Sequence, residues 1–66
     1  MQTITVGSIT YAQKARRALT GEGIGARLVK LSSEREGCIY GVEVGEARYF
    51  DAVALLDRLG LYKREL

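Results

Sequence analysis

Two short segments of this chain end in the same way, and this repeat sets the order of the expected elements. Residues 18–24 read Ala-Leu-Thr-Gly-Glu-Gly-Ile, and residues 55–61 read Leu-Leu-Asp-Arg-Leu-Gly-Leu. In each segment a leucine lies four residues before a glycine, and an aliphatic residue follows that glycine. Glycine commonly follows the last turn of a helix. The repeat therefore predicts two helices, the first ended by Gly21 or Gly23 and the second by Gly60.

The spacing of apolar residues predicts the other elements. Apolar and polar residues alternate over residues 3–6 and 38–44, which is the period of a half-buried strand. Residues 24–31 form another expected strand, with aliphatic side chains on both of its faces, so that its inward face stays open. Helical spacing covers residues 11–19, with Ser8 and Thr10 as the competing N-caps. The apolar stripe of this helix consists of Ala12, Ala15 and Leu19.

A second helix is expected over residues 47–59, and a polar loop over residues 32–37. The expected apolar ridge of the helix consists of Tyr49, Val53, Leu56 and Leu59, with Phe50 and Ala54 beside it. Residues 61–66 are expected to add at most a short last strand. The resulting order, β-α-β-β-α-β, predicts an α+β domain with an antiparallel sheet and the ferredoxin-like split βαβ arrangement.

The length of 66 residues indicates one small domain, residues 1–66. A core of this size typically supplies only about 3–5 kcal/mol, and such domains often add a disulfide, a metal or a partner subunit. A single cysteine cannot form an intramolecular disulfide, and the absence of histidine argues against a metal site. By elimination, the sequence suggests a homodimer, and it calls for no cofactor.

The charge pattern argues against nucleic acid and membrane as partners. The net charge is only +2, and the basic residues are spread over both halves among eight acidic ones. No apolar run approaches the roughly 20 residues of a membrane span. The N-terminus shows no signal-peptide pattern, and a lone thiol suits a reducing compartment, so we expect a cytoplasmic protein.

Cys38 is the one plausible nucleophile of the chain. In the expected topology the first strand ends, the first helix begins and the third strand begins at one edge of the sheet. A helix N-terminus and a nearby arginine can lower a cysteine pKa from ~8.5 to about 3.5–7.5. The alternative is that Cys38 is a small buried hydrophobic residue on the face of Tyr40 and Val42. The residues expected to surround and orient the thiol are Gly7, Ser8, Thr10, Ser33, Arg35 and Gly37.

Several short motifs resemble one family. They are Gly7-Ser8-x-x-x-Ala12-x-x-Ala15, Leu19…Gly23-Ile24, Arg27-Leu28-Val29 and Gly37-Cys38. Together they are similar to small bacterial domains of unknown function described as selenium/sulfur-carrier-like proteins. The resemblance implies a compact cytoplasmic domain whose cysteine holds sulfur or selenium as a persulfide or selenosulfide, with a donor or acceptor protein as its partner. The family pattern often continues Cys-Gly, whereas Ile39 follows Cys38 here.

Three functions compete at this point. The first is a sulfur or selenium carrier that uses Cys38, with Arg35 as its charge partner. The second is a non-catalytic interaction or regulatory module, such as a homodimer, in which Cys38 is structural. The third is RNA binding, which this topology supports in other proteins through strand aromatics. The expected strands offer Tyr40 alone, and the first strand has no aromatic residue.

Overall fold

The computed structural model describes residues 1–34 and 37–61, with the backbone alone for residues 32–34 and 37. The chain forms β1 (Gln2–Gly7), α1 (Ile9–Gly21), β2 (Ala26–Glu34), β3 (Gly37–Val44), a 3-10 turn (Glu46–Arg48) and α2 (Tyr49–Arg58). The three strands make one antiparallel sheet in the order β1-β3-β2. These elements confirm the α+β class. Residues 62–66, where most of a last strand was expected, lie outside the described residues.

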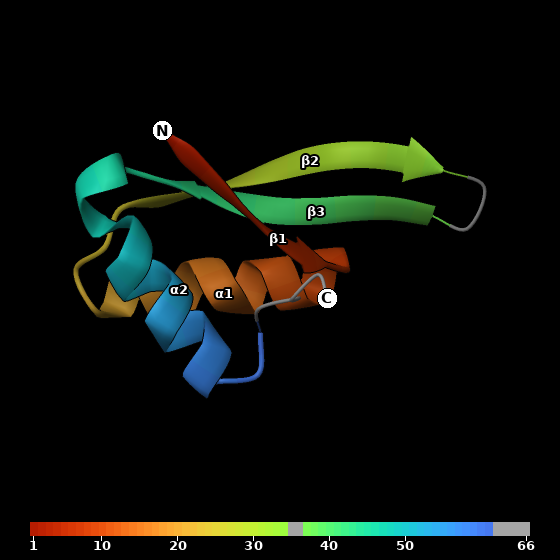
Figure 1. The fold of residues 1–66 in the computed structure, drawn as a ribbon. Helices are drawn as coiled ribbons and strands as arrows, with labels where there is room; N and C mark the ends of the chain where they lie inside the picture. Colours follow the sequence, from red (N-terminus) through yellow and green to blue (C-terminus); the bar gives the residue numbers. More distant parts are fainter. Residues whose placement is uncertain (35–36, 62–66) are drawn as a thin grey trace.

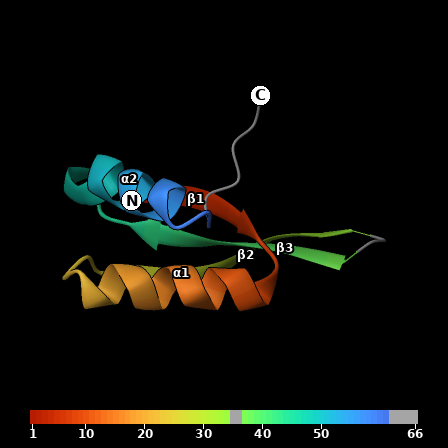
Figure 2. The same cartoon turned by 90° about the horizontal axis from the view of Figure 1, so that it is seen from below.

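One face of the sheet carries the core. The strands bury Ile4, Val6, Val42 and Val44 on this face, and Ala26 and Leu28 of β2 pack against the same cluster. This settles which face of β2 points inward. Both helices lie below the sheet in Figure 1 and contact each other, and the view from below shows them on either side of β3 (Figure 2). Their buried residues are Ala12, Ala15 and Leu19 from α1, and Ala52, Leu55 and Leu56 from α2.

The stripe of α1 confirms the prediction, but the ridge expected for α2 is wrong in part. The stripe of α2 is centred on Ala52 and Leu56, with Tyr49 and Val53 only partly buried beside it. Phe50, expected beside the ridge, is 82% exposed. The small Ala52 side chain is fully buried and faces the core, which brings the helix backbone close to its neighbours. Helical spacing alone does not distinguish these two adjacent stripes.

The repeated helix ends are two copies of one hydrogen-bond motif. After α1, the Gly23 and Ile24 N–H groups donate to the carbonyls of Thr20 and Leu19, at 3.0 and 2.9 Å. After α2, the same pattern joins Gly60 to Asp57 at 3.1 Å and Leu61 to Leu56 at 2.8 Å. Gly23 and Gly60 have φ values of 78° and 73°. These are Schellman motifs, in which the left-handed residue is usually glycine.

The β2–β3 hairpin extends past the end of β1. The last residue pair between β1 and β3 is Gly7 with Tyr40, whereas β2 and β3 continue to pair as far as Glu34 and Gly37. The expected loop over residues 32–37 is therefore too long, because cross-strand pairing with β3 keeps residues 32–34 extended despite their polar side chains. Figure 1 shows the hairpin projecting beyond the helices.

Candidate functional site

Cys38 lies on the projecting hairpin. It is the second residue of β3, pairs with Ser33 of β2 and is half-buried. It lies two residues before Tyr40, on the side of the hairpin turn. Tyr40 is the β3 residue nearest that turn that still pairs with β1. At a strand rise of about 3.3 Å per residue, this places Cys38 roughly 7 Å along the hairpin from the end of β1. The alternation of β3 puts Cys38 on the face of Tyr40 and Val42.

The residues expected around the thiol divide into two groups. Gly7 ends β1 opposite Tyr40, and Ser8 is the N-cap of α1, its hydroxyl oxygen accepting a 3.3 Å bond from the Tyr11 N–H. Thr10 lies exposed within α1 and is not the cap. The second group, Ser33 and Gly37, lies on the hairpin, where Ser33 pairs with Cys38 and Gly37 with Glu34. Arg35 lies outside the described residues.

The described residues lack two features that many active sites have. They bury no polar or charged side chain. They also contain no group of three or more histidine, cysteine, aspartate or glutamate residues able to hold a metal ion. Catalytic sites usually depend on such desolvated titratable groups. Cys38 and the exposed surfaces remain as candidate sites in the described part.

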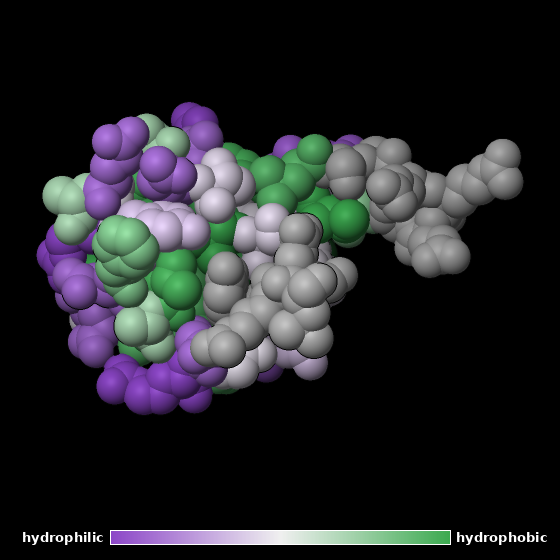
Figure 3. Space-filling view, in the orientation of Figure 1, coloured by the Kyte–Doolittle hydropathy of each residue, from purple (hydrophilic) through white to green (hydrophobic). Residues whose placement is uncertain are grey.

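The second face of the sheet is such a surface, since no described helix covers it. Val29 and Ile39 are half-buried on this face, and Leu31 is 40% exposed. A register shift between Lys30 and Ser32 gives β2 one extra residue, Leu31, at this point. Figure 3 shows hydrophobic surface over β2 and β3 beside β1. We call Val29, Leu31 and Ile39 the open-face patch.

The described charges on the open face are paired. Arg27 of β2 lies directly opposite Glu43 of β3 in the strand register, and its Nη2 atom is 2.7 Å from the Glu43 carboxylate. The aliphatic residues on both faces of residues 24–31 were the sequence signal for this surface. Strand alternation already places Leu31 on the same face as Arg27 and Val29. The bulge that follows, between Lys30 and Ser32, depends on strand pairing and has no local signal.

Among the described residues, no helix combines the length and apolar character needed to cross a membrane. Comparison with protein-family models, with curated proteins and with solved structures finds no match for this chain.

Proposed function

We propose that this protein is a non-catalytic interaction module that forms a homodimer through the open face of its sheet. The observation that carries the proposal is the open-face patch, an aliphatic strip on a sheet face that no described helix covers. The element order and the β1-β3-β2 sheet also support a ferredoxin-like split βαβ fold, to which a last strand would be added at β1. The single cysteine, which cannot form an intramolecular disulfide, supports a cytoplasmic location.

A second copy suits the open face because two copies of this face would not repel each other through their described charges. In a twofold interface the same surface meets itself, so an unpaired charge near the axis meets its own copy. The described charges on this face, Arg27 and Glu43, neutralise each other at 2.7 Å. Contact between two copies removes the aliphatic side chains from water, and each Å² of buried apolar surface contributes about 25 cal/mol of favourable free energy. A chain of this size gains proportionally more from that burial than a large domain does.

Sedimentation velocity tests the homodimer across micromolar to millimolar concentrations. We expect a concentration-dependent dimer for the natural chain. Leu31→Asp places an unpaired carboxylate in the patch of each copy, so this variant should sediment as a monomer. Leu59→Asp is the matched control, because Leu59 is comparably exposed at 49% but lies at the end of α2. A natural chain that stays monomeric at millimolar concentration, or a Leu31→Asp variant that still dimerises, contradicts the proposal.

A second candidate is the sulfur or selenium carrier. The observation that favours it is that Cys38 is half-buried near the end of a projecting hairpin, rather than enclosed in the core. In this proposal the Cys38 thiolate attacks the outer sulfur of a donor protein's persulfide. A new S–S bond forms at Cys38, and the donor cysteine leaves as its thiolate.

Intact mass spectrometry tests the carrier after incubation with a cysteine desulfurase and free cysteine. The carrier gains the mass of one sulfur atom on Cys38, and reduction by a thiol removes it. Cys38→Ser gains nothing. An unchanged mass for the natural chain, or equal labelling of Cys38→Ser, rejects this function without affecting the dimer proposal.

A further inference from the structure

A pocket lies on the helix side of the molecule, between the end of α1 and the flank of α2. Its volume is about 300 Å³. The lining residues are Glu22, Ile24, Arg48, Asp51, Ala54, Leu55 and Arg58. Small-molecule pockets commonly measure roughly 300–1,000 Å³, so this one suits a ligand the size of an amino acid better than a nucleotide. The sequence pattern did not indicate it, because its residues come from segments far apart in the chain.

Two aliphatic residues line the inner part of the pocket, and its backbone is held in place. Ile24 and Leu55 are 3% and 9% exposed, respectively. The Glu22 N–H donates to the carbonyls of Ala18 and Leu19 at 3.2 and 3.0 Å, and the Ile24 N–H also donates to Leu19. These bonds fix the wall that follows α1 before any ligand arrives. A preformed wall lowers the entropy cost of binding.

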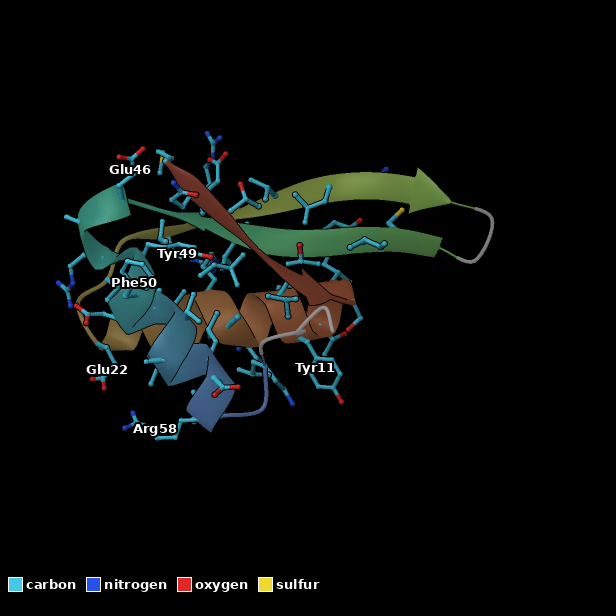
Figure 4. The ribbon with its side chains drawn as sticks, in the orientation of Figure 1. Tyr11, Glu22, Glu46, Tyr49, Phe50 and Arg58 are labelled. Atoms are coloured by element: carbon cyan, nitrogen blue, oxygen red, sulfur yellow. The ribbon has the colours of Figure 1, made fainter. Side chains whose placement is uncertain are left out.

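The rim carries four charged side chains, of which one pair is already neutralised. Arg48 Nε lies 3.1 Å from the Asp51 carboxylate. Within the described part of the chain, Glu22 and Arg58 form no ion pair. Figure 4 shows Glu22 at the end of α1 and Arg58 on α2 at the same corner of the molecule. The rim therefore offers one carboxylate and one guanidinium beside the aliphatic residues Ile24 and Leu55.

We propose that this pocket binds a free α-amino acid with an aliphatic side chain. The Arg58 guanidinium receives the ligand carboxylate, the Glu22 carboxylate receives the ammonium group, and the aliphatic side chain lies against Ile24 and Leu55. A simple carboxylate leaves Glu22 unpaired, and a simple amine leaves Arg58 unpaired. The zwitterion satisfies both. The pocket lies away from the open-face patch, so this proposal stands independently of the homodimer and of Cys38.

Amide chemical-shift titration with L-leucine tests the site. We expect saturable shifts in the millimolar range at Ile24, Ala54 and Leu55. The probes 4-methylpentanoate, which lacks the ammonium group, and 3-methylbutylamine, which lacks the carboxylate, should bind more weakly. Arg58→Gln and Glu22→Gln should each weaken leucine binding about five-fold, the upper range for an exposed ion pair. Arg17→Gln, an exposed change on α1 outside the pocket, should leave binding unchanged.

Three results overturn the proposal. One is the absence of saturable shifts at the pocket residues. Another is equal binding of leucine and either single-charge probe, which would show that the rim does not recognise a zwitterion. The third is unaltered leucine binding by both rim variants, whose spectra also report that each variant is folded.

Discussion

A Cβ atom on Gly41 would collide with the carbonyl oxygen of Ile4. The same atom would lie 3.0 Å from Leu31 Cδ1. Gly41 is buried in the central strand, where it pairs with Thr5 of β1. Glycine within a strand often marks a close approach of two backbones. Here it lets the backbone of β1 approach β3 closely at Ile4, with Leu31 on the same side of the sheet.

Gly41→Ala should therefore destabilise the protein by about 1–3 kcal/mol, the usual cost of overpacking a tight site. The obstacle is a backbone carbonyl, which cannot rotate away as a side chain can. Urea unfolding followed by circular dichroism measures the change. Gly45→Ala is the control, because Gly45 has no atom near its Cβ position and an ordinary φ of −65°. The control should change stability by less than about 0.5 kcal/mol. Equal stabilities of the two variants would show that the strands separate easily here.

The features that could be predicted from the sequence are those formed by local interactions. Both helix ends were predictable because a Schellman motif joins residues only a few positions apart, such as Leu19 with Ile24. The register shifts at Val6 and Leu31 were not, because they depend on which residue of β3 lies opposite. The exposure of Cys38 depends on how far the hairpin extends past β1, which is also a consequence of pairing.

Gly23→Ala and Gly60→Ala should each destabilise the protein by about 1 kcal/mol, because alanine is strained at positive φ. Both positions have open space around the Cβ, so the cost comes from the backbone alone. Gly21→Ala provides the contrast. Gly21 lies inside the last turn of α1, where alanine should stabilise by up to about 1 kcal/mol. Urea midpoints at constant slope would measure all three. A neutral Gly23→Ala would contradict the left-handed turn.

Ser8→Ala should cost about 0.5–2 kcal/mol, because it removes the side-chain acceptor at the N-terminus of α1. The hydroxyl accepts from the Tyr11 N–H at 3.3 Å, so the lower half of that range is expected. Thr10→Ala is the matched control, since Thr10 is an exposed residue within the helix and makes no cap bond. Thermal unfolding distinguishes the two caps that the sequence leaves open. A larger loss of stability for Thr10→Ala than for Ser8→Ala would show that Thr10, and not Ser8, caps the helix.

The Arg27–Glu43 pair should affect dimerisation more than stability. The pair is partly exposed, with 72% and 24% side-chain exposure, so its contribution to folding should stay within about 1 kcal/mol. Arg27→Gln leaves each Glu43 unpaired on the open face, where it would meet its own copy across the proposed twofold axis. This variant should dimerise more weakly than the natural chain.

The double change Arg27→Gln with Glu43→Gln should restore dimerisation, because it removes the leftover charge together with the pair. Salt provides an independent check. At 1 M salt the screening length falls to about 3 Å, so the single variant should regain much of its lost affinity while the double variant changes little. Sedimentation equilibrium gives the dimer constants for both variants at low and high salt. A double variant as weak as Arg27→Gln alone would mean that the ion pair binds the partner directly, rather than keeping the open face neutral.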